Sequence, residues 1–234
     1  MFEMIIAHKY SWKRLIVSYI FLLVGLILLS LKNPFISNLM FFLFTGLALL
    51  IQFDREKLKL MFDKLEPTYT FDISGKSVTF NKFSMILTTT FSGYIIAMLL
   101  NILLTKVGLS SNAHVAFDKP YQLLNELPYM WIGLIGEELL KCCILFPMFS
   151  LLSRKYTVLK AFIFSAFITN SIFGMLHFGA YGWNLPQLLL MIGLPSIIWY
   201  VALYKTQSLR SVIAIHITHD YIVFGAALLL IYLN

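Results

Sequence analysis

The sequence predicts an all-α integral membrane protein, a polytopic bundle of about seven transmembrane helices (six to eight). Of its 234 residues, 59% are hydrophobic, and the mean hydropathy is +0.82. Only 12% are charged, whereas a soluble domain carries about 25%. So little polar surface cannot cover a water-soluble globule of this size, but helix faces toward lipid stay apolar without cost. We therefore expect residues 1–234 to form a single integral membrane domain.

Seven apolar runs have the length of about 20 residues that a membrane-spanning helix needs. The second run follows the first after a short linker, so these two should form a helical hairpin. Pro195 predicts a kink in the sixth run, and a missing cleavage site indicates that the first is retained rather than removed as a signal peptide. The predicted spans are Leu15–Leu31, Phe35–Phe53, Phe83–Leu104, Leu127–Leu152, Val158–His177, Leu185–Tyr204 and Val212–Leu233.

The segment 54–82 is the one long loop on the basic side. Its first part places apolar residues on one face among charges, which predicts a short amphipathic helix along the membrane surface. Alternating apolar and polar residues on both sides of Ser74-Gly75-Lys76 predict a β-hairpin. We expect this loop to be cytoplasmic and to have no catalytic role.

The basic residues are distributed unevenly between the two sides of the predicted bundle. Most of the 18 Lys and Arg residues fall in the N-terminal segment, the 54–82 loop and the later connections on the same side. The positive-inside rule then predicts a multi-pass cell-membrane protein with a cytoplasmic N-terminus and an extracellular C-terminus. Because these residues flank apolar runs, they indicate topology and not nucleic-acid binding, and the expected partners are the lipid bilayer and a peptide.

Ionisable residues inside the apolar runs point to a functional site. An ionisable group at bilayer depth costs about 2.5–3.5 kcal/mol on insertion scales, and by default such a group faces the bundle interior and serves a site. The fourth predicted span carries Glu137, Glu138 and Lys141, and the fifth ends at His177. The seventh carries His216, His219 and Asp220, which are the remaining residues of the candidate site.

Helical spacing brings these side chains onto shared faces. Glu137 and Lys141 are four residues apart, as are His216 and Asp220, and residues at this spacing are neighbours on a helix surface. Three helices would thus bring carboxylates and imidazoles to a common interior, where they can bind and deprotonate water and stabilise an oxyanion. No Ser or Cys is paired with a base in the same way.

At these residues the chain resembles the CAAX protease and bacteriocin-processing family of membrane peptidases, also called Abi. That family has three motifs, EExxxR, FxxxH and HxxxN or a close variant. Glu137-Glu138 match the first pair, Phe173 and His177 match the second motif, and His216 matches the start of the third. The resemblance covers the peptidase-like region 127–234.

The resemblance implies glutamate-dependent peptide hydrolysis without a covalent intermediate, a metal or another cofactor. By likeness, Glu137 is the general base and holds water together with His177, while His216 and Asp220 stabilise the oxyanion. Glu138 is then a structural residue, with Lys141 and His219 in support.

Two positions depart from the family pattern. The motif's Arg falls on Cys142, although Lys141 can reach Glu138 at i, i+3, without the bidentate fork of an Arg. Asp220 replaces an Asn, so it would have to be neutral to donate to an oxyanion, or would instead orient His216 or His219.

The predicted function is an intramembrane peptidase that cleaves a membrane-associated peptide or precursor, such as a bacteriocin or pheromone leader. A non-catalytic bacteriocin self-immunity or binding protein of the same fold is the alternative that the two departures favour. A zinc peptidase using Glu137, His177 and His216 or His219 is a third possibility, although no HExxH motif is present. A proton-coupled transporter is the fourth.

Overall fold

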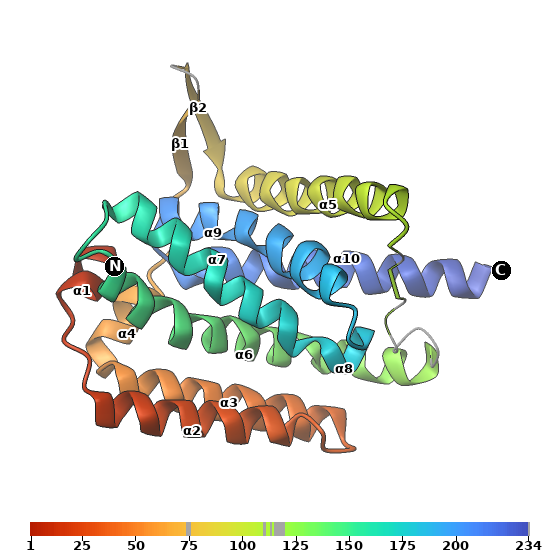
Figure 1. The fold of residues 1–234 in the computed structure, drawn as a ribbon, viewed down its shortest axis with the longest axis horizontal. Helices are drawn as coiled ribbons and strands as arrows, with labels where there is room; N and C mark the ends of the chain where they lie inside the picture. Colours follow the sequence, from red (N-terminus) through yellow and green to blue (C-terminus); the bar gives the residue numbers. More distant parts are fainter. Residues whose placement is uncertain (74–75, 110, 113, 115–119, 234) are drawn as a thin grey trace.

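The long helices run back and forth along a common direction, as a polytopic bundle requires (Figure 1). The computed structural model describes residues 1–73, 76–109, 111–112, 114 and 120–233. The long helical segments within these ranges are α2 (Trp12–Leu28), α3 (Pro34–Gln52), α5 (Lys82–Lys106), α6 (Pro120–Leu152), α7 (Val158–Leu176), η2 (Gln187–Gly193) continuing into α9 (Leu194–Thr206), and α10 (Leu209–Leu233).

Five of these segments are long and apolar enough to cross a membrane, namely α3, α5, α7, η2–α9 and α10. Helices α2 and α6 stand at the other two predicted spans. The first has 17 residues, and the second has 33 residues that include Glu137, Glu138 and Lys141. The predicted all-α, polytopic membrane bundle is confirmed, and its helices match the predicted apolar runs to within a few residues, except that α6 begins seven residues early.

Side-chain caps explain where several helices begin. Asn33 accepts a hydrogen bond from the backbone N–H of Ile36 at the start of α3, and Asn81 accepts one from Ser84 at the start of α5. Asp54 does the same for α4 (Arg55–Met61). Each cap satisfies an amide that has no partner within its own helix, so the chain turns into a helix at these positions.

The 54–82 segment has the predicted amphipathic helix and hairpin. Helix α4 buries Met61, and strands β1 (Thr68–Ile73) and β2 (Lys76–Asn81) pair antiparallel with Tyr69 opposite Phe80. The hairpin projects from one end of the bundle (Figure 1). The predicted turn at Ser74-Gly75 lies outside the described residues.

Two short helices were not predicted. Helix α1 (Phe2–Ala7) packs on α6, with the ring of Phe2 about 5 Å from the rings of Phe149 and Phe162. Helix α8 (Phe178–Tyr181) follows α7. Both are too short to produce a clear 3.6-residue pattern, so the sequence gives little periodic signal for them.

Helix α6 lies between the α2–α3 hairpin and the group formed by α7, α9 and α10, while α5 packs on α9 and α10 (Figure 1). Gly136 permits the close contact of α6 with α3. A Cβ at this position would lie 2.8 Å from Cδ1 of Phe41 and 3.2 Å from Cα of Phe42. Small residues at helix contacts are typical of membrane bundles, and this one fixes the part of α6 that precedes Glu137.

The sequence predicted a kink at Pro195 in the sixth span. The structure has the π-helical turns of η2 directly before this proline. A proline lacks the N–H that would bond to the residue four positions earlier, which is consistent with wider turns at this point. A Cβ at Gly174 of α7 would collide with the carbonyl oxygen of Leu188, so this glycine allows η2 to pack against α7.

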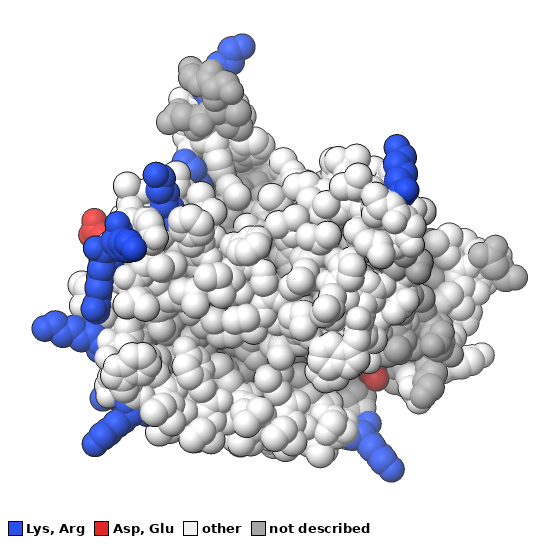
Figure 2. Space-filling model, viewed as in Figure 1, with Lys and Arg blue, Asp and Glu red and all other residues white. Residues whose placement is uncertain are grey.

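The surface is divided by charge. Most of the Lys and Arg side chains visible in Figure 2 lie at the end where Figure 1 places the N-terminus, α1 and α4, and the middle of this face carries no charge. An uncharged belt between more polar ends is what a lipid-embedded bundle needs. The protein is therefore a multi-pass membrane protein, and the orientation of its termini stays a prediction.

Candidate active site

The two glutamates of α6 point in different directions because successive residues on a helix are about 100° apart. The side chain of Glu138 is 1% exposed and lies in the core of the bundle, whereas that of Glu137 is 26% exposed and borders a cavity. One carboxylate is thus available to a substrate or water, and the other is enclosed by protein.

His216 of α10 lies between these carboxylates. Its Nδ1 is 2.7 Å from Oε1 of Glu138, and its Nε2 is 3.6 Å from Oε2 of Glu137. The same Nε2 is 3.7 Å from Oδ2 of Asp220, four residues later on α10. The two longer distances exceed a direct hydrogen bond but suit a bridging water or a substrate oxygen.

Lys141 neutralises the enclosed glutamate. Its ammonium forms an ion pair with Glu138, as the i, i+3 spacing predicted, and its side chain is fully buried. The ammonium also lies 4.2 Å from the ring centre of Phe173 and 5.3 Å from that of Trp199, close enough for cation–π attraction. The hydroxyl of Tyr200 donates to the other oxygen of Glu138 at 3.5 Å. Lys141 therefore supplies the positive charge next to the buried carboxylate of Glu138.

Asp220 is paired with His219, whose Nδ1 lies 2.9 Å from Oδ1 of the carboxylate. Aromatic contacts hold His219 in place. The ring of Tyr94 stacks on it at 4.4 Å, the Tyr94 hydroxyl donates to its backbone carbonyl at 2.5 Å, and Trp199 lies 4.9 Å away. Asp220 thus has one oxygen on His219 and the other facing His216.

His177 caps the end of α7, and its Nδ1 lies 2.9 Å from the carbonyl oxygen of Phe173. A carbonyl can only accept, so Nδ1 is the donor in this hydrogen bond. In the neutral imidazole Nε2 then has a free lone pair, which can accept a proton or a hydrogen bond from water. The pattern FxxxH has a direct structural role here, since the first residue of the motif orients the ring of the last.

All the predicted site residues except Glu138 and Lys141 line one cavity of about 400 Å³. Its remaining wall is largely aromatic and aliphatic. A second cavity of about 250 Å³ shares Glu137 and His177 with the first. Within the described residues, no three His, Cys, Asp or Glu side chains have positions that could hold a metal ion. Both cavities also include His114, which the sequence analysis missed.

His114 belongs to the connection before α6, which the sequence analysis left without a function. Its ring lies 5.0 Å from that of Tyr181 and 5.3 Å from that of Phe224. Burial lowers the pKa of His114, as does the neighbouring His177, while Asp220 opposes the shift. The small number of histidines in the sequence could have pointed to His114. The chain has five histidines, and every one except His8 lines these cavities.

Residues 119–222 match the family model described as Rce1-like, type II CAAX prenyl endopeptidase Rce1-like. This segment, called the Rce1-like segment below, is similar to that family. It covers a little under half of the chain and contains every predicted site residue from Glu137 to Asp220. No curated protein and no solved structure gives a significant match to the chain.

The resemblance to CAAX proteases, first seen in three short motifs, is confirmed over the Rce1-like segment. It supports an intramembrane protease function of the CAAX endopeptidase type. The geometry brings Glu137, His216 and Asp220 together and places His177 on the same cavity. The catalytic role of each residue in the Rce1-like segment stays a prediction.

Proposed function

We propose that this protein is a glutamate-dependent intramembrane endopeptidase that needs no metal and cleaves a membrane-associated peptide or precursor by activated water. The observation that carries the proposal is the position of Glu137. Its carboxylate borders a cavity inside an apolar bundle, with Oε2 3.6 Å from Nε2 of His216 and with His177 on the same wall. A partly buried carboxylate and two imidazoles around one cavity can supply a base and an oxyanion donor.

In the proposed reaction, water lies between Glu137 and Nε2 of His177. Glu137 takes a proton from the water, and the oxygen of this water attacks the scissile carbonyl carbon. The attack forms a tetrahedral intermediate with a negatively charged oxygen. When the intermediate collapses, the C–N bond breaks and Glu137 passes the proton to the leaving nitrogen. No covalent bond to the protein forms in this reaction.

His216 is the proposed donor to the oxyanion. Nδ1 of His216 faces Oε1 of Glu138, so a proton on Nε2 would point toward Glu137, Asp220 and the cavity. Asp220 lies beside His219 and His216, and a carboxylate oxygen can only accept a hydrogen bond, so in this scheme the oxyanion is stabilised by His216.

The surroundings of the site support a membrane-associated substrate. The cavity lies within the apolar helices, so the scissile segment must approach the bilayer and enter in an extended form. We propose a bacteriocin- or pheromone-type leader as the substrate. The family description suggests prenylated CAAX peptides as the second substrate class to compare with it.

The test is cleavage of quenched fluorescent peptides of both classes by the full chain reconstituted in lipid vesicles. Glu137→Gln keeps the shape of the side chain but removes the base, so kcat should fall by at least about 10³-fold, the upper part of the range for losing an acid–base group. Glu126→Gln, on the exposed part of α6, is the matched control and should retain activity. Undiminished cleavage by Glu137→Gln would refute the mechanism.

The non-catalytic alternative is tested with the same variant. If the protein confers bacteriocin resistance by binding alone, Glu137→Gln should protect cells as well as the unaltered chain does. Loss of peptide cleavage together with loss of any processed product in cells supports the peptidase.

A further inference from the structure

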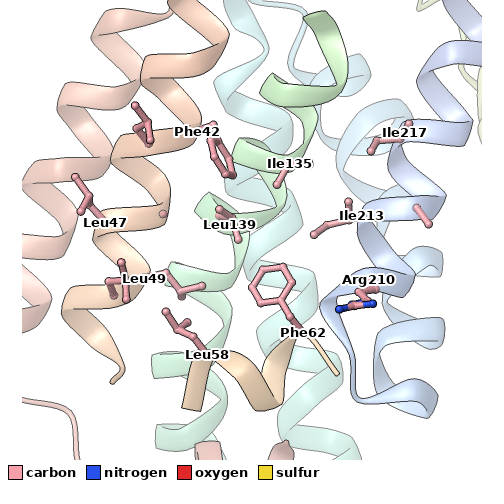
Figure 3. Close-up of a pocket in the computed structure, with 14 residues that line it drawn as sticks. Phe42, Leu47, Leu49, Leu58, Phe62, Ile135, Leu139, Arg210, Ile213 and Ile217 are labelled. Atoms are coloured by element: carbon pink, nitrogen blue, oxygen red, sulfur yellow. The ribbon is translucent and has the colours of Figure 1, made fainter. Parts of the chain in front are cut away.

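A second hollow lies on the face of α6 opposite the candidate active site. Ile135 and Leu139 of α6 form its floor, and Glu137 is about 200° away around the helix from Ile135. The groove runs between α3 and α10, and α4 closes one end (Figure 3). Its volume is about 690 Å³, within the range of about 300–1,000 Å³ typical of small-molecule sites.

The lining of this groove is apolar apart from one residue, Arg210. In Figure 3, Arg210 lies at the same end of the groove as Leu58 of α4 and Phe62, which follows α4. This is also the end of the bundle where basic residues gather (Figure 2). Among the described residues, no carboxylate lies within 4 Å of its guanidinium nitrogens.

The position of Arg210 on α10 has no benefit for the helix itself. It is the second residue of α10, and a cation in the first turn opposes the helix macrodipole. A guanidinium presents several N–H donors in a fork that fits the oxygens of a phosphate. An anion at the groove's end would therefore compensate both the side chain and the helix terminus.

The groove is short enough to lie within one leaflet of a bilayer. Along α10 it extends from Arg210 to Ile217, eight residues that span about 10 Å. Half of a hydrocarbon core of about 30 Å is about 15 Å. An acyl chain whose head group lies beside Arg210 would run along most of this depth without reaching the other leaflet.

We propose that this groove binds an anionic phospholipid from the leaflet on the basic side of the protein. The phosphate pairs with Arg210, and one acyl chain lies against Ile135, Leu139, Ile213 and Ile217. An extended peptide would leave backbone N–H and C=O groups without partners on these walls. An acyl chain has no such groups, so the apolar lining favours the lipid.

The test is native mass spectrometry of the purified full chain in detergent with equal amounts of phosphatidylglycerol and phosphatidylcholine. The unaltered chain should retain phosphatidylglycerol about tenfold better, as expected for one charge-assisted contact. Arg210→Gln should abolish this preference. Arg14→Gln removes an exposed arginine at the same end of the bundle, on α2 and away from the groove, and should leave it unchanged.

A second pair of variants tests the acyl chain. A Cβ at Gly46 would meet only Cδ1 of Leu139, at 3.9 Å, so Gly46→Leu should fold and fill the groove. It should reduce retention of both lipids. Leu47→Trp narrows the groove from its exposed side and should do the same if Gly46→Leu fails to fold.

Several results would overturn the lipid site. The first is equal retention of the two lipids by the unaltered chain. The second is a preference for phosphatidylglycerol that persists in Arg210→Gln, and the third is lipid retention that persists in both groove-filling variants. Stronger retention of a 15-carbon isoprenoid alcohol than of phosphatidylglycerol would also overturn it. None of these measurements involves peptide cleavage, so the lipid site and the proposed protease function can fail separately.

Discussion

At the scale of single residues, the site depends on how a fully buried ion pair is enclosed. Glu138 and Lys141 are both inaccessible to solvent, and the pair is surrounded by His216, Tyr200 and the rings of Phe173 and Trp199. Burying a charge is costly unless a partner and hydrogen bonds replace its water. These partners keep His216 fixed with its Nε2 toward the cavity.

Lys141→Met should therefore destabilise the protein by about 3–5 kcal/mol, the usual cost of leaving one member of a buried pair without its partner. The double variant Glu138→Gln with Lys141→Met should recover part of this loss because no charge then remains uncompensated. Unfolding of the purified protein in detergent measures both effects.

Lys106→Met, at the exposed end of α5, is the control and should change stability little. If Lys141→Met proves as stable as the unaltered chain, the ion pair is not a structural requirement of the site.

At the scale of helices, Glu137 is positioned by the contact between α6 and α3. That contact depends on Gly136, where even a methyl group would overlap Phe41 and press against the backbone of Phe42. Packed interiors do not yield freely to added volume, so α6 would have to shift and take the Glu137 carboxylate with it.

Gly136→Ala should cost about 1–3 kcal/mol of stability and lower peptidase activity. Gly46→Ala is the matched control on the facing helix, because its Cβ would have only one contact, at ordinary van der Waals distance. It should be neutral or stabilising, since alanine has the higher helix propensity. Unfolding and cleavage assays on both variants measure this difference, and equal effects would show that the close approach at Gly136 is unimportant.

At the scale of the whole molecule, the alternating helices put the hairpin and the C-terminal end of α5 at opposite ends of the bundle (Figure 1). The basic end carries α4 and the hairpin, and the positive-inside rule assigns that end to the cytoplasm. The two native cysteines, Cys142 and Cys143, are buried in α6, which makes the chain suitable for labelling at introduced cysteines.

A membrane-impermeant maleimide added to intact cells should label Lys106→Cys at the end of α5 and should not label Lys76→Cys in the hairpin. Both positions are exposed in the structure, so permeabilised cells should show labelling at both, as the control. Labelling of Lys76→Cys from outside intact cells would reverse the predicted orientation.

The sequence by itself determined the membrane class, the course of the long helices, the hairpin and the resemblance of the second half to CAAX proteases. These features depend on local properties, namely runs of apolar residues, two-residue and 3.6-residue periodicity, and ionisable groups at bilayer depth. The pairing of Lys141 with Glu138 was also predictable, since both lie on one helix three residues apart.

Only the tertiary structure decided which groups from different helices meet. It placed His216 between Glu137 and Glu138, added His114 from a connection without a clear pattern, and surrounded the buried charges with Trp199 and Tyr200. It also opened the groove beside Arg210. Such contacts join residues far apart in the chain and depend on the rotation and spacing of neighbouring helices. Side-chain volumes fix that rotation and spacing only when all the helices are packed together.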